Sequence, residues 1–108
     1  MPKKKESIRT KKVGFYRVSE NVVAREIEGE LIIVPLVSGM GNLEDELYSL
    51  NETGKAIWKR LDGTRDLKTI VRELALEFEA SSGEVEEDVM GLTRELLERG
   101  MLVEIQKG

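Results

Sequence analysis

The sequence predicts an α+β fold in which a three-stranded antiparallel sheet is followed by three helices. Two observations predict it. Short runs rich in β-branched residues fill the first half of the chain, whereas apolar residues recur at helical spacing after Leu50. Because the strands come first and the helices second, an α+β arrangement is expected rather than a series of βαβ units. The length of 108 residues is that of one domain.

The three strands are expected before Leu50. Residues 22–27 and 31–36 flank Glu28-Gly29 and predict a β-hairpin. Pro35 cannot donate a ladder hydrogen bond, so we expect it at a strand end or at a sheet edge. A polar, glycine-containing loop over residues 38–45 follows, and residues 47–50 predict a third, short strand.

The first two helices are marked by their ends. Asn51 is a good N-cap, and Asp62-Gly63 predicts the stop of a short first helix of about ten residues. Asp66 caps the second helix. That helix carries an amphipathic stripe at helical spacing, formed by Leu67, Ile70, Val71, Leu74, Ala75 and Phe78.

A capping box over residues 81–84 predicts the start of the third helix, and Gly100 predicts its end. Residues 101–105 could add a short strand or pack beneath the helices. Three short helices beside a small sheet are the arrangement of a winged helix, which is the fold that we expect.

The third helix has more apolar surface than a core needs. A helical wheel gives one apolar lobe, expected in the core, and a second lobe about 100° away. The second lobe could line a groove, or it could be buried between the sheet and the second helix. The first lobe consists of Val85, Val89, Leu92 and Leu96, and the second of Met90, Thr93 and Leu97.

The charges are unevenly distributed. The chain has 17 Lys and Arg against 21 Asp and Glu, a net charge of -4. Residues 1–12 hold six Lys and Arg and one Glu, or +5, so the remaining 96 residues sum to -9. We expect residues 1–12 to be a disordered basic tail and residues 13–108 to be the folded domain; the alternative for the tail is an arm that contacts an acidic surface.

Composition excludes several function classes. Without Cys or His there is no disulfide, no thiolate or imidazole metal site, and no catalysis by these side chains. The acidic clusters lack EF-hand spacing, and no phosphate-binding glycine motif is present. We therefore expect a protein that is not an enzyme and that has neither a cofactor nor a metal.

The longest uncharged run, residues 31–43, has 13 residues and is too short to span a membrane. No signal peptide is apparent, so a cytoplasmic protein without a membrane partner is expected. The third helix carries six acids and two arginines. A DNA-reading helix would be repelled by phosphates with that charge, so we expect no nucleic-acid partner.

Residues 50–63 read LN-x-TG-xx-IW-xx-LDG. This segment resembles the signature of the PqqD family, named for pyrroloquinoline quinone (PQQ) biosynthesis protein D. The flanks agree with the resemblance, because a β-hairpin precedes the segment, an aliphatic helix follows it, and residues 96–102 read L-L-E-R-G-M-L. The resemblance covers about residues 13–105. The apolar residues of the signature, Leu50, Ile57, Trp58 and Leu61, are expected mainly in the core.

The resemblance implies a peptide-binding module, the RiPP recognition element. Such domains bind the leader of a ribosomally made precursor peptide and present it to a modifying enzyme, commonly a radical SAM enzyme. In the family, the leader adds as a strand to the third strand and lies against the third helix. Carried onto this chain, the implied peptide-binding residues are Glu46, Leu47, Tyr48, Ser49 and Leu50 on the strand, and Glu86, Val89, Met90, Thr93 and Leu97 on the helix.

Three alternatives remain open on the sequence alone. One is a winged-helix DNA-binding regulator that uses its basic tail, and another is a scaffold subunit without a peptide ligand. The third concerns assembly, because the exposed third strand could pair with a second copy and form a homodimer that competes with the peptide.

Overall fold

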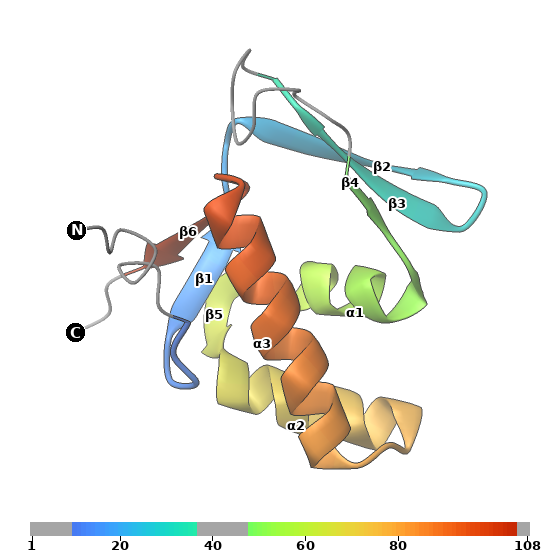
Figure 1. Cartoon of the computed structure of the whole chain (residues 1–108), viewed down its shortest axis with the longest axis vertical. Helices are drawn as coiled ribbons and strands as arrows, with labels where there is room; N and C mark the ends of the chain where they lie inside the picture. Colours follow the sequence, from blue (N-terminus) through green and yellow to red (C-terminus); the bar gives the residue numbers. More distant parts are fainter. Residues whose placement is uncertain (1–9, 37–47, 106–108) are drawn as a thin grey trace, which may run out of the picture.

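Six strands and three helices make up the described residues, 10–36 and 48–105, of the computed structural model (Figure 1). The strands are β1 (Phe15–Val18), β2 (Val22–Ile27), β3 (Glu30–Pro35), β4 (Tyr48–Leu50), β5 (Asp62–Asp66) and β6 (Leu102–Ile105). The helices are α1 (Glu52–Arg60), α2 (Leu67–Phe78) and α3 (Ser82–Glu98). This mixed architecture of antiparallel sheets and three helices confirms the predicted fold class.

The predicted three-stranded sheet is present, with the order β2-β3-β4 and antiparallel pairing throughout. Glu28 and Gly29 form the turn of its hairpin, and both have a positive φ. Pro35 lies at the end of β3 opposite Val22, where no ladder bond from its nitrogen is needed. In Figure 1 the tip of this hairpin extends away from the helices.

A second antiparallel sheet, with the order β5-β1-β6, was not predicted. It pairs the beginning of the domain with its end, since Phe15 lies opposite Ile105. Helix α1 ends at Arg60, just before the segment Asp62-Gly63, as expected. This segment also starts β5, where the register against β1 is irregular and Gly63 has a positive φ of 84°. Because L side chains rarely adopt this φ, and a Cβ on Gly63 would also lie 2.6 Å from Cδ1 of Ile105, the position favours glycine.

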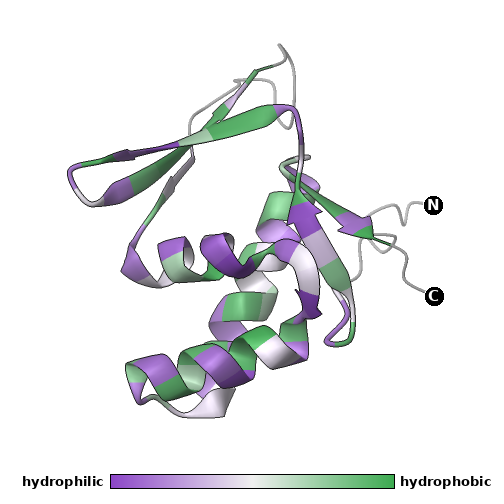
Figure 2. Ribbon diagram, turned by 180° about the vertical axis from the view of Figure 1, so that it is seen from behind, coloured by the Kyte–Doolittle hydropathy of each residue, from purple (hydrophilic) through white to green (hydrophobic). Residues whose placement is uncertain are grey.

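The helix starts are confirmed. The side chains of Asn51, Asp66 and Ser81 accept hydrogen bonds from the amides three residues later and cap α1, α2 and α3. Gly100, with a φ of 76°, follows the end of α3 as predicted. Figure 2 shows hydrophobic and hydrophilic residues alternating along the helices, as amphipathic helices require.

The signature segment serves the core. Leu50, Ile57, Trp58 and Leu61 are all less than 10% exposed, and they pack in one cluster with residues from all three helices. Gly54 lets α1 approach β4, because a Cβ there would lie 3.1 Å from Cδ2 of Leu50. The expectation that this segment is mainly structural is confirmed.

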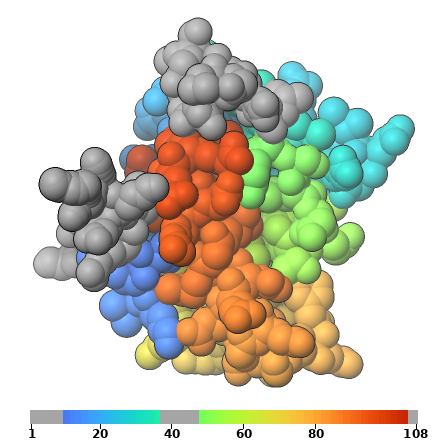
Figure 3. Space-filling model, in the orientation of Figure 1, coloured from blue at the N-terminus to red at the C-terminus, as the bar shows by residue number. Residues whose placement is uncertain are grey.

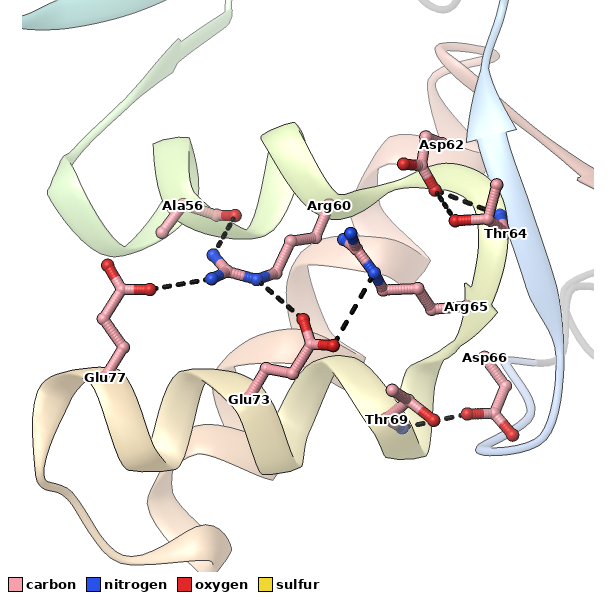
Figure 4. A network of polar contacts seen from close by, with 9 residues as sticks. All are labelled: Ala56, Arg60, Asp62, Thr64, Arg65, Asp66, Thr69, Glu73 and Glu77. Atoms are coloured by element: carbon pink, nitrogen blue, oxygen red, sulfur yellow. Dashed lines mark hydrogen bonds and ion pairs between the residues drawn. The ribbon is translucent and has the colours of Figure 1, made fainter.

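Ion pairs tie α1 to its neighbours. The guanidinium of Arg60 contacts Glu73 at 3.0 Å and Glu77 at 2.8 Å, and it thereby links α1 to α2 (Figure 4). Lys55 contacts Glu26 at 2.9 Å and donates to the Gly29 carbonyl, which fastens the β2–β3 hairpin to α1. The hydrogen bond between the Lys55 and Glu26 side chains raises the pKa of Lys55 and lowers the pKa of Glu26.

The disordered tail was predicted over residues 1–12, of which residues 1–9 lie outside the described residues. Within the described part, Lys12 pairs with Glu86 at 2.9 Å, and its carbonyl accepts from the Lys68 amide. None of the helices in residues 10–36 and 48–105 combines the length and the hydropathy needed to cross a membrane.

Candidate functional site

Strand β4 forms one edge of the β2-β3-β4 sheet. Among the described strands it pairs only with β3, with Leu31 opposite Leu50, Ile32 opposite Ser49 and Ile33 opposite Tyr48. Its other side therefore carries main-chain groups without a strand partner. An edge of this kind is the usual place for an added strand.

The register tells which β4 amide points outward. The Leu36 amide donates to the Asn21 carbonyl, so these two residues form a hydrogen-bonded pair. The next pair, Val22 and Pro35, is a non-hydrogen-bonded pair. Opposite pairs in an antiparallel ladder alternate between these two kinds. It follows that the odd-numbered residues of β3 direct their main-chain N–H and C=O groups to β4. The even-numbered residues, such as Ile32, direct theirs to β2. Ser49, which lies opposite Ile32, consequently turns its N–H and C=O away from β3.

This free edge opens into a hollow of about 440 Å³ between β4, the start of α1 and α3. Figure 3 shows the surfaces of α3 and of the β4–α1 segment side by side on one face of the molecule. The hollow is lined by the residues of β4 on one side and by α3 on the other, namely Tyr48, Ser49, Leu50, Asn51, Asp88 and Leu92 among others. A strand added to β4 would therefore also lie against α3.

The side of α3 that faces β4 is a single helical stripe. Asp88 and Leu92 line the hollow, and the stripe continues through Glu95 to Arg99 at the spacing i, i+4, i+7 and i+11. The guanidinium carbon of Arg99, the C-cap residue of α3, lies 4.4 Å from the ring centroid of Tyr48, which is a cation–π contact between the end of α3 and β4. Arg99 is also held by Glu95 at 3.0 Å.

Both charged residues that line the hollow are acidic. Glu30 and Asp88 line it, and Glu95 lies near enough to influence Tyr48, whereas Arg99 is the nearby cation and is paired with Glu95. Burial raises the pKa of the Tyr48 hydroxyl, and the Glu95 carboxylate raises it further against the opposing effect of Arg99. The hydroxyl is therefore protonated at neutral pH and can donate a hydrogen bond. The described residues contain no group of acidic side chains arranged to hold a metal ion.

The structure divides the site residues expected from the sequence. Glu46 and Leu47 lie outside the described residues. Tyr48 and Ser49 line the hollow, and Ser49 is exposed. Leu50 also borders the hollow, but only 4% of it is exposed.

The expected helix residues do not face β4. Val89 and Thr93 are fully buried, so neither offers surface to a ligand in this structure. Glu86, Met90 and Leu97 lie on the other side of α3 from Leu92, because each residue turns a helix by about 100°. Of the first lobe, Val85, Val89 and Leu96 are buried as expected, whereas Leu92 lines the hollow. Of the second lobe, Thr93 is buried in the core, which is the alternative that the sequence left open.

Sequence reasoning missed the stripe of Asp88, Leu92, Glu95 and Arg99. Its signal was present as a helical spacing, but three of the four residues are charged and so appeared to be a solvated face. Lys55, which positions the hairpin through Glu26, was missed as well.

A protein family matches most of the chain. The family of "Coenzyme PQQ synthesis protein D (PqqD)" matches residues 30–102. The PqqA binding protein of Xanthomonas oryzae pv. oryzae (strain PXO99A) is 38% identical over 58 residues, which are 54% of this chain and 63% of the relative. The PqqA binding protein of Xanthomonas campestris pv. campestris (strain B100) is 34% identical over a match of the same extent. The chain thus spans less than two thirds of the length of these relatives.

Solved structures share the fold. TbiB1 in complex with the TbiA(beta) leader peptide has a TM-score of 0.67 at 22% identity, covering 84% of this chain and 99% of that one. A lasso peptide synthetase B1 complexed with the leader peptide has a TM-score of 0.68 at 20% identity, covering 82% and 96%. The PqqD part of Methylobacterium extorquens PqqCD, a RiPP recognition element, has a TM-score of 0.71 at 17% identity, covering 91% and 98%.

Proposed function

The chain belongs to the PqqD family, and from this premise we propose that it binds the leader of a ribosomally made precursor peptide and presents it to a modifying enzyme. The chain itself performs no chemistry in this proposal. The enzyme is a radical SAM enzyme, as the family resemblance implies, and the role is that of an adaptor.

The observation that carries the proposal is the free edge of β4 beside α3. By the pairing register, the N–H and C=O of Ser49 point away from β3, and Ser49 lines the hollow. An extended peptide that pairs with β4 would gain main-chain hydrogen bonds there, and alternate side chains would point toward α3. Leu92 would then supply apolar contact in the middle of the helix stripe.

The charges around the hollow indicate which leader sequences can bind. The hollow is bordered by Glu30 and Asp88, and the cation Arg99 is already engaged by Glu95 and Tyr48. A leader with a Lys or Arg flanked by aliphatic residues complements this surface, whereas an acidic leader is repelled. We therefore propose a leader that is cationic where it crosses α3.

Backbone amide shifts measured by NMR test the proposal directly. The ¹⁵N-labelled chain is titrated with synthetic leader peptides encoded beside its gene and, for comparison, with PqqA from Xanthomonas oryzae and the TbiA(beta) leader. We expect shifts that centre on Ser49 and Leu92 and saturate with at least one peptide. If every peptide leaves these amides unshifted, or shifts only amides remote from β4, the proposal is wrong.

A pair of charge reversals sharpens this test. Asp88→Lys reverses the charge of a residue that lines the hollow. Glu87→Lys makes the same change in net charge at the neighbouring exposed position, about 100° away around the helix. A cationic leader should lose affinity for the first variant and keep it for the second. Equal effects would show that only the net charge matters and that the hollow is not the site.

A leader peptide and a second copy of the chain would compete for the same edge of β4. A homodimer through β4 would occupy the groups that the leader needs, so leader binding would depend on protein concentration. Sedimentation of the free chain, with and without the leader, distinguishes the two uses of the edge.

A further inference from the structure

A second hollow lies on a different part of the molecule, between α2 and the start of α3. Its volume is about 610 Å³. Side chains of α2 form its apolar floor, and basic side chains form its rim. The floor consists of Val71, Ala75 and Leu76, and the rim includes Lys12, Lys68 and Arg72.

The rim is positive on a chain that is otherwise acidic. Three of the lining residues are cations, and one, Glu86, is an anion that is already paired with Lys12 at 2.9 Å. Lys68 and Arg72 lie one helical turn apart, and neither makes an ion pair with a residue in the described ranges. Hydrogen bonds from Thr69 lower the pKa of the nearby Asp66 carboxylate, and both cations lower it further without forming an ion pair with it, so each can still pair with a ligand.

The floor adds an exposed apolar group. Leu76 is 77% exposed, the largest exposed fraction among the large hydrophobic side chains of the described residues. It lies beside Arg72 at the border of the hollow. An apolar side chain rimmed by unpaired cations is suited to a segment that carries aliphatic and acidic residues together.

The two hollows are separate. They share no lining residue, and they use opposite sides of α3, since Glu86 and Asp88 are two residues and therefore about 200° apart. A ligand in one hollow leaves the other open. An adaptor requires this arrangement, because the leader and the enzyme must be held at the same time.

We propose that this second hollow is the docking surface for an acidic, aliphatic segment of the modifying enzyme. An aliphatic side chain of that segment packs over Val71 and beside Leu76, and neighbouring carboxylates pair with Lys68 and Arg72. The identity of the partner as a modifying enzyme rests on the proposed function, whereas the chemistry of the segment rests on the hollow itself.

The probe is a pair of synthetic hexapeptides: one alternates Leu with Asp or Glu, and the other has Lys in place of every acid. Each is titrated into the ¹⁵N-labelled full chain at low salt. We expect the acidic peptide to shift the amides of Lys68, Arg72 and Leu76, and the basic peptide to leave them unshifted. No shift with the acidic peptide, or equal shifts with both, would overturn the proposal.

Variants locate the contact. Lys68→Glu combined with Arg72→Glu should lower the affinity for the acidic peptide roughly tenfold or more, because two attractive charge pairs at the surface become repulsive. Both residues are exposed, and an unchanged amide spectrum elsewhere shows that the fold is intact. The matched control, Arg94→Glu combined with Lys59→Glu, makes the same change in charge at exposed positions outside the hollow and should not weaken binding.

Two further outcomes separate this proposal from others. A leader that binds at Ser49 with equal affinity in the Lys68→Glu, Arg72→Glu variant supports independent sites. If no leader binds but the acidic peptide does, the proposed function fails and the docking surface stands. If the peptide-free chain instead shows concentration-dependent shifts at Leu76 that disappear in the variant, the occupant is a second copy and the proposal is wrong.

Discussion

Ser49→Pro tests whether a peptide adds to the free edge of β4. The pairing register turns the Ser49 amide away from β3, so proline removes a donor that the sheet does not use. Proline is also tolerated on an edge strand. Ser49→Ala is the matched control, because it removes the same hydroxyl and keeps the N–H.

The expected magnitude follows from what each variant loses. One main-chain hydrogen bond contributes about 0.5–1.5 kcal/mol, which is roughly a twofold to tenfold change in affinity. The proline ring also occupies the place of the incoming strand, so we expect leader binding to weaken by at least about tenfold. Within residues 10–36 and 48–105, the hydroxyl lost in Ser49→Ala reaches only Glu30, at 3.4 Å on the surface, so this control should bind within about twofold of the parent.

Two measurements complete the test. Fluorescence anisotropy of a labelled leader gives the affinity, and urea unfolding followed by the single tryptophan, Trp58, gives the stability. The stability should change by no more than about 1 kcal/mol, since the β3–β4 ladder is intact. A proline variant that binds normally would refute strand addition at β4. One that unfolds would refute the register, because it would show that the Ser49 amide belongs to the ladder.

Three other predictions concern the hollow, the core and a helix cap. Leu92→Ala should lower the affinity for the leader about fivefold to thirtyfold in calorimetric titrations, which is the equivalent of ~1–2 kcal/mol of lost apolar contact. Leu76→Ala should leave this affinity unchanged. The opposite ranking would contradict the assignment of the two hollows. Thr93→Val should raise the free energy of unfolding by about 1 kcal/mol, because the Thr93 hydroxyl is buried and has no hydrogen-bond partner among the described groups; a loss of stability would show that the hydroxyl is satisfied. Hydrogen bonds from Thr69 hold the pKa of Asp66 below its ordinary value of 3.8, so their stabilisation is present above that value and is lost as the pH falls through the lower, folded-state pKa. Asp66→Ala should therefore cost about 1 kcal/mol at pH 7 and progressively less in acid, as measured by urea unfolding at several pH values, and a cost independent of pH would argue against the cap.

Much of the fold follows from local patterns in the sequence. The β2–β3 hairpin and the caps at Asn51, Asp66 and Ser81 depend on neighbouring residues, and these predictions are confirmed. Strand β5 is different. Its sequence, DGTRD, is polar and contains glycine, so it resembles a turn, and only its pairing with β1, more than 40 residues earlier, makes it a strand.

The hollow includes Tyr48, Ser49 and Leu50 of the expected strand residues, but on the helix it is lined by Asp88 and Leu92, which the sequence did not single out for it. A helical wheel gives the width of the apolar surface of α3 but not its orientation. The orientation is set by contacts with elements distant in sequence, which bury Thr93 and leave Leu92 beside β4. The pairing of Arg99 with the ring of Tyr48 likewise joins residues 51 positions apart. No local pattern in the sequence encodes such a contact.

The two hollows have opposite charge, and this difference can sort their ligands. On the two proposals above, a cationic leader would be attracted to the surface of Glu30 and Asp88 and repelled by Lys68 and Arg72, while an acidic segment would have the reverse preference. Each ligand would therefore be directed to one side of α3 by attraction at its own site and repulsion at the other. Raising the salt concentration should weaken both interactions and also reduce this discrimination, because the charges concerned are exposed. If discrimination survives high salt, shape rather than charge separates the two sites.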